Sequence, residues 1–177
     1  MGALHRDFPR SLEVGAAMLI FFDTEFTALS SEADCLSVGL VTEDGERELY
    51  LERSDVDRSA CSDFVIEHVL PLFGRYPEAR CLYLNFVSAL QEWLLKLPGE
   101  HQFACNSQRD FLLLSSILQG DLPDHCRGEN QLLGLEEPEF WEQRLAHYFK
   151  GHPDQPRHHA LYDARALREA YLRSATD

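Results

Sequence analysis

A short apolar run that ends in two acidic residues limits the possible folds of this chain more than any other feature. The longest apolar run is Val14–Phe22, and Asp23 and Glu25 follow it directly. It is much shorter than the roughly 20 residues that span a bilayer. Although Arg6 and Arg10 precede it, no small-residue cleavage site follows, so we do not expect a signal peptide. The pattern predicts a fully buried strand over 17–22.

The rest of the sequence alternates between strand and helix patterns. Residues 35–41 and 48–52 are expected to form strands on either side of a turn at 43–46, and 102–105 a short later strand. Helical spacing of apolar residues predicts five helices, over 64–73, 81–97, 110–118, 137–150 and 160–173. The turn-rich stretch 120–134 shows no clear periodicity.

This order of elements predicts the α/β class. We expect a mixed sheet that begins with a three-stranded antiparallel meander, has further strands and is flanked by α-helices. Residues 1–15 are expected to be a loosely ordered N-terminal leader, and 16–177 a single domain.

Net charge and cysteine content limit the kind of substrate contact and the cellular compartment that we expect. The net charge is −14, whereas proteins that grip long duplexes usually carry a basic face. A nucleic-acid substrate would therefore have to make a small, local contact. The five cysteines are odd in number and scattered, with no C-x-x-C pair, which argues against a disulfide scaffold or a zinc ribbon. We expect a reduced, cytoplasmic protein without a membrane segment.

Acidic residues recur where the expected elements begin or end. Because strand side chains alternate, Asp23 and Glu25 share one face, where a divalent cation would relieve their repulsion. Asp110 opens a helix, and Asp163 lies beside the apolar stripe of the last helix, just after His158. Each motif alone has a simple structural explanation: a solvated strand end, a helix cap or a helix start with surface histidines. Their combination in one domain favours a metal site.

The same motifs resemble those of a known enzyme family. Asp23-Thr-Glu-Phe-Thr-Ala-Leu29, Asn106-x-x-x-Asp110 and His158-x-x-x-x-Asp163 are similar to the three motifs of the DEDDh 3′–5′ exonucleases, which have a ribonuclease H-like fold. Further stretches, such as Leu36-Ser-Val-Gly-Leu-Val41, resemble a family of compact bacterial 3′–5′ exoribonucleases. The resemblance covers about residues 17–173 and departs at Ala28, where many relatives have Gly.

The resemblance implies a two-metal mechanism. Asp23, Glu25 and Asp163 would hold one divalent ion, Mg²⁺ or Mn²⁺, and Asp23 would reach a second with help from Asp110. The family spacing selects His158, and not His159, as the general base. The expected substrate contacts are Thr24, Phe26, Thr27, Leu29, Asn106 and Arg157.

The resemblance also implies the substrate and the assembly. The expected substrate is single-stranded RNA, or RNA with a 3′ overhang, shortened to nucleoside 5′-monophosphates. Relatives are often homodimers, so a homodimer is the assembly to test. Three alternatives remain open at this point. They are an exonuclease for DNA or very short oligonucleotides, a catalytically silent binding module, and a metal-dependent hydrolase of free nucleotides.

Overall fold

One mixed sheet organises the part of the chain that the computed structural model describes, residues 17–134 and 137–174. Its six strands within these residues are β1 (Met18–Phe26), β2 (Cys35–Thr42), β3 (Glu48–Arg53), β4 (Arg80–Cys81), β5 (His101–Cys105) and β6 (Cys126–Leu132). They lie side by side in the order β4-β3-β2-β1-β5-β6. β2 pairs antiparallel with both β1 and β3, whereas β5 pairs parallel to β1, β6 to β5 and β4 to β3. The expected α/β class and antiparallel meander are thus confirmed.

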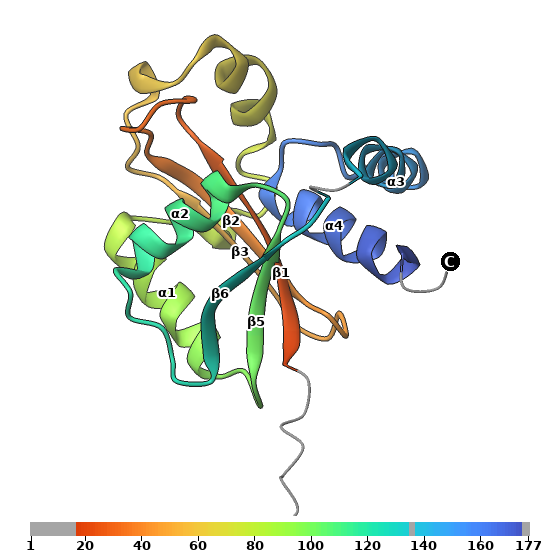
Figure 1. Ribbon diagram of the computed structural model, residues 1–177. Helices are drawn as coiled ribbons and strands as arrows, with labels where there is room; N and C mark the ends of the chain where they lie inside the picture. The colour runs from red at the N-terminus through yellow and green to blue at the C-terminus, as the bar shows by residue number, and fades with distance from the viewer. Residues whose placement is uncertain (1–16, 135–136, 175–177) are drawn as a thin grey trace, which may run out of the picture.

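Helices cover both faces of this sheet (Figure 1). On one face lie α1 (Tyr83–Leu95) and α2 (Gln108–Leu118). On the other, α4 (Ala160–Ser174) packs on β1 and β2, and α3 (Pro138–Gly151) packs on the outside of α4. None of the helices in the described ranges is long and apolar enough to cross a membrane.

Strand alternation divides the core between these two faces. Ile20 and Phe22 of β1 belong to the cluster that contains Phe86 of α1 and Leu114 of α2. Leu19 and Phe21 belong instead to a second cluster with Ala164 and Leu167 of α4. All four β1 side chains are at most 4% exposed, so the central strand is buried on both sides, as its continuous apolar sequence predicts.

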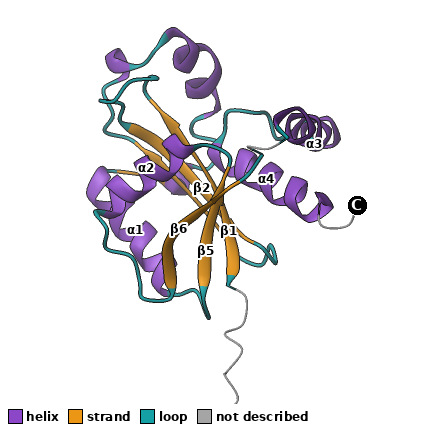
Figure 2. Cartoon of the chain, viewed as in Figure 1, coloured by secondary structure: helices purple, strands orange, loops and turns teal. Residues whose placement is uncertain are grey.

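A chain of short helical turns joins β3 to β4 and lies at the upper end of the view in Figure 2. A regular helix predicted over 64–73 is wrong, because a π-helical turn at Val65–Val69 is followed by a 3₁₀ turn at Leu70–Leu72. Pro71 lacks an N–H and cannot continue an α-helical ladder, which accounts for the change of winding. The other two turns are Arg58–Ala60 and Pro77–Ala79.

Two other expectations need correction. Cys81 lies in β4 and not in the following helix, which begins at Tyr83. The turn-rich stretch 120–134, for which no helix or strand was predicted, contains β6, an edge strand whose sequence Cys126–Leu132 is mostly polar and so lacks the apolar pattern of a buried strand. The leader expected at 1–15 lies outside the described residues.

Candidate functional site

A pocket of about 350 Å³ lies at the carboxyl end of β1. It receives side chains from β1, from the start of α2, from the short helical turns and from the start of α4. All four predicted carboxylates and His158 line it, together with the expected contacts Thr24, Phe26, Leu29 and Asn106. Four segments that are distant in sequence thus meet in one cavity.

Three of the carboxylates form a tight group. One oxygen each of Asp23, Glu25 and Asp163 lies within 4.8 Å of the other two. Strand alternation places the first two on the α4 face of β1, where the first turn of α4 supplies the third. The pairing of β1 with β2 shifts register between Glu25 and Phe26, and such an irregularity changes the direction in which neighbouring side chains point.

The close approach of α4 to the sheet depends on a glycine. Gly39 of β2 is the register partner of Asp23. A Cβ atom at Gly39 would lie 2.3 Å from the carbonyl carbon of Ala160 and from the backbone nitrogen of Leu161. Only a residue without a side chain therefore lets the first turn of α4 rest on the strand and bring Asp163 to β1.

Asp110 reaches the pocket from the opposite layer. It is the third residue of α2, which is capped by Ser107, whose hydroxyl accepts a hydrogen bond from the Asp110 N–H. The explanation of Asp110 as a capping residue is therefore wrong, and its carboxylate is left for another role. That carboxylate is 3% exposed and accepts a hydrogen bond from the hydroxyl of Thr24.

Burial raises the pKa values of all four carboxyl groups, and the crowding of negative charge adds to the shift of Asp23 and Glu25. Burial, reinforced by Asp110, Asp163 and Glu25 in that order, raises the pKa of Asp23 well above its usual value. Burial likewise raises the pKa of Glu25 and of Asp110, and it raises the pKa of Asp163 to about 7. Without a cation, these carboxylates would have to share protons to avoid mutual repulsion.

The two adjacent histidines have different surroundings. His158 adopts a positive φ of 65° just before α4 and lines the pocket, with its ring 5.0 Å from that of Phe64. His159 is 1% exposed and stacks between Tyr50 and Tyr162, at 4.3 and 4.0 Å. Burial lowers the pKa of both, that of His159 to about 4. Only His158 is placed to exchange a proton with a group in the pocket.

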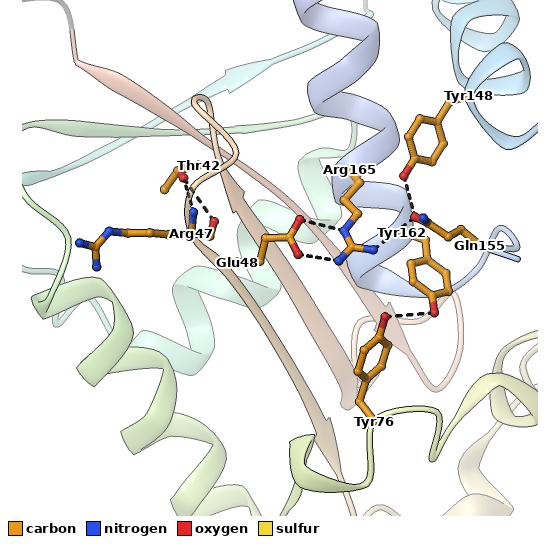
Figure 3. A network of polar contacts seen from close by, with 8 residues as sticks. All are labelled: Thr42, Arg47, Glu48, Tyr76, Tyr148, Gln155, Tyr162 and Arg165. Carbon is orange, nitrogen blue, oxygen red and sulfur yellow. Dashed lines mark hydrogen bonds and ion pairs between the residues drawn. The ribbon is translucent and has the colours of Figure 1, made fainter. Parts of the chain in front are cut away.

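The loop that carries His158 is fixed by a network of polar contacts (Figure 3). Gln155 accepts hydrogen bonds from Tyr148 of α3, at 2.7 Å, and from Arg165 of α4, at 3.3 Å. Arg165 also forms a two-pronged ion pair with Glu48 of β3. At the other end of the loop, the His159 N–H donates to Asp163 at 3.0 Å. The loop that carries the candidate base is therefore linked to α3 and α4, and through Arg165 to β3.

Two of the expected substrate contacts lie outside the pocket lining. Thr27 is 3% exposed, and its hydroxyl accepts a hydrogen bond from the N–H of Asp34, which closes the loop after β1. Arg157 forms an ion pair with Glu142 at 2.7 Å. Leu29, by contrast, is 83% exposed at the pocket rim.

Sequence reasoning missed the part of the pocket made by the short helical turns. Ser62, Phe64, Val65 and Val69 all line it, and Phe64 is 51% exposed there. In the sequence, these apolar residues have the spacing of a core helix, and nothing else marks them. An aromatic side chain left exposed beside an acidic pocket is the signal that the structure adds.

Comparison with solved structures supports the fold. The chain is similar to exonuclease I, whose reported structure suggests how processivity is achieved, with a TM-score of 0.55 and 13% identity. The match covers 86% of this chain and 39% of that chain, so this protein spans well under half of the length of its neighbour. No protein-family model matches the sequence, and no curated protein matches it. The likeness and the strand order of the sheet together indicate a ribonuclease H-like fold.

Proposed function

We propose that this protein is a metal-dependent 3′–5′ exoribonuclease that releases nucleoside 5′-monophosphates from the 3′ end of single-stranded RNA. The observation that carries the proposal is the meeting of four carboxylates from three separate segments in one pocket, beside an accessible imidazole. A strand and two helix starts supply these carboxylates, so their convergence depends on the fold and not on a local run of acidic residues. The likeness to exonuclease I is consistent with the proposal at the level of the fold.

Carboxylate oxygens are suitable ligands for hard divalent cations. Asp23, Glu25 and Asp163 would hold one Mg²⁺ or Mn²⁺, and Asp23 with Asp110 a second, because both ions prefer carboxylate oxygens. Burial and mutual repulsion, which raise the pKa of these groups, are the forces that a bound cation offsets. When bound, such a pair supplies a more acidic water and stabilises the departing 3′-oxygen.

His158 is the residue that we assign as general base. Its ring borders the same pocket as the carboxylates, and burial, followed by His68, lowers its pKa and so favours the neutral form. A neutral imidazole can take the proton of an attacking water. The stacked, fully buried His159 is excluded from this role by its position.

The apolar part of the pocket lining is suited to a base and a sugar. Leu29, Phe26 and Phe64 present apolar and aromatic surface to the pocket. Stacking on such side chains is the usual way in which proteins hold an unpaired nucleotide. A pocket of about 350 Å³ is at the lower end of small-ligand sites and suits one terminal nucleotide.

A nuclease for very short oligonucleotides is the alternative that one observation favours, and DNA is the other substrate to compare. Among the residues that line the pocket, none is Lys or Arg, so few upstream phosphates would be neutralised there. Matched RNA and DNA oligomers of several lengths, degraded side by side, would decide between these substrates. Faster loss of DNA would overturn the assignment of RNA.

The cellular setting and the assembly are further parts of the proposal. All five cysteines are free thiols, as expected for a protein of the reducing cytoplasm. A homodimer is the expected assembly by resemblance alone, and light scattering behind a sizing column would test it.

The direct test of the function is incubation with an RNA labelled at its 5′ end in Mn²⁺ or Mg²⁺. We expect a ladder of 3′-shortened products that EDTA abolishes. His158→Ala should slow it by about 10²- to 10⁴-fold, whereas His147→Ala, at an exposed position of α3, should have no effect. Unchanged nucleotide release by His158→Ala would show that the assigned base is wrong, and activity on free nucleotides alone would replace the exonuclease by a nucleotide hydrolase.

A further inference from the structure

Thr24 lies between the two acidic residues of β1, but its side chain points to the other face of the sheet. Strand alternation directs Asp23 and Glu25 to the α4 face, and directs Thr24 to the face covered by α1 and α2. The Thr24 side chain is 3% exposed, so its hydroxyl has almost no contact with solvent. A buried hydroxyl needs a partner inside the protein.

That partner is the carboxylate of Asp110. The Thr24 hydroxyl donates to Oδ1 of Asp110 across 86 positions of sequence, and both residues are 3% exposed. Hydrogen bonds that end on a charged group are stronger and more directional than neutral ones. This bond therefore fixes the rotamer of the Asp110 side chain relative to β1.

Asp110 needs such a constraint more than the other three carboxylates do. Asp23 and Glu25 are on β1 itself, and Asp163 is brought to it by the close contact of α4 with Gly39. The start of α2 is anchored by Ser107, whose hydroxyl accepts from the Asp110 backbone N–H. That bond fixes the backbone of Asp110, whereas the Thr24 hydroxyl links its carboxylate to the strand that bears Asp23.

We propose that Thr24 is a positioning residue that directs the Asp110 carboxylate towards the cation shared with Asp23. This role differs from the substrate contact that the sequence suggested for Thr24, and it rests on the proposed function. It does not require the Thr24 side chain to touch the substrate. The methyl group of Thr24 is not needed for this role, so a serine should replace it and a valine of the same shape should not.

The test is a Mn²⁺ binding isotherm of the EDTA-treated protein, measured by calorimetry and by electron paramagnetic resonance. We expect two ions in the wild type, with the weaker one lost in Asp110→Asn. Thr24→Val should weaken the same ion by about 10- to 100-fold, the range for residues that orient a metal ligand. The tighter ion should be unaffected, and Thr24→Ser should stay within about threefold of the wild type.

Thr42→Val provides a matched control for the loss of a buried strand hydroxyl. Thr42 of β2 is 1% exposed, donates to Asp44 at 2.6 Å and accepts from the Arg47 N–H at 3.2 Å, in a turn outside the pocket. Thr24→Val and Thr42→Val should both lower the melting temperature in EDTA, but only the first should change Mn²⁺ binding. If Thr24→Val does not fold by circular dichroism, Thr24→Ala takes its place.

Several results would overturn the inference. They are two ions of wild-type affinity in Thr24→Val, equal weakening of both ions, and the same weakening in Thr42→Val. A single ion in the wild type that Asp110→Asn leaves unchanged would remove the role of Asp110 and this inference with it. A wild type that binds no Mn²⁺ would instead contradict the proposed function itself, so the two failures can be told apart.

Discussion

On the α4 side of β1, a candidate ligand is placed by backbone contact, whereas on the α2 side it is placed by one side-chain hydrogen bond. The first turn of α4 rests on Gly39, and an oxygen of Asp163 lies within 4.8 Å of one from Asp23 and one from Glu25. Asp110 depends on the Thr24 hydroxyl. The group of Asp23, Glu25 and Asp163 and the surroundings of Asp110 should therefore respond differently to substitution. We expect a rigid three-carboxylate half, and an adjustable half around Asp110.

The largest expected effect comes from removing a ligand of the rigid half. Asp163→Asn should reduce kcat/KM for an RNA oligomer by at least about 10³-fold, because a metal ion contributes several kcal/mol to such a transition state. Asp110→Asn should cost less. Equal losses, measured side by side at saturating Mn²⁺, would show that the two halves do not differ.

Adding a side chain at Gly39, where β2 contacts α4, should have the next largest effect. Gly39→Ala places a Cβ atom against the backbone of Ala160, so α4 must move away from β2. We expect Mn²⁺ affinity to fall by about 100-fold and stability by about 1–3 kcal/mol. Gly128→Ala, at an exposed position of β6 where an added Cβ meets nothing, is the control. Wild-type Mn²⁺ affinity in a folded Gly39→Ala protein would refute the rigid contact.

A smaller effect should follow from loosening the loop that carries His158. Gln155→Ala removes the bridge between Tyr148 and Arg165 (Figure 3). We expect kcat to fall about tenfold, as when a residue that orients a catalytic group is lost, with Mn²⁺ affinity unchanged. Gln143→Ala, on the exposed side of α3, should change neither. Loss of metal affinity in Gln155→Ala would place the bridge in the metal site and not behind the base.

The smallest effect concerns stability and pH in the metal-free protein. The pKa of Asp163 is raised from 3.8 to about 7, so in that window the folded state holds a proton that the unfolded state releases. Stability must then fall as pH rises. In EDTA, we expect the melting temperature to drop by about 3 °C or more between pH 5.5 and pH 8, the shift for about 1 kcal/mol at this length.

Mn²⁺ and a neutral ligand variant sharpen this pH prediction. Mn²⁺ should restore the melting temperature chiefly at pH 8, because it binds the deprotonated folded state. Asp163→Asn should flatten the pH dependence. A melting temperature that rises with pH in EDTA would contradict the raised pKa.

Local patterns were sufficient to predict the part of the fold that surrounds β1. The apolar run before Asp23 and the alternation that pairs it with Glu25 are properties of neighbouring residues, and the structure places both as expected. His158 and Asp163 were likewise placed at the start of the last helix from sequence alone. Their roles in metal binding and proton transfer stay predictions.

What the sequence could not supply are features that depend on contacts between distant segments. Ser107, and not Asp110, caps α2, and only the fold brings Thr24 to that carboxylate. β6 has a polar edge-strand sequence that no apolar pattern marks. Phe64 joins the pocket through irregular turns around Pro71, although its spacing is that of a core helix.

The central claim is that carboxylates from both sides of β1 seat a pair of cations. Diffraction from crystals soaked in Mn²⁺, recorded at the manganese absorption edge, tests it most directly. The account predicts two anomalous peaks in the pocket, one among Asp23, Glu25 and Asp163 and one between Asp23 and Asp110. No peak in the pocket of a crystal that holds Mn²⁺ elsewhere would contradict it.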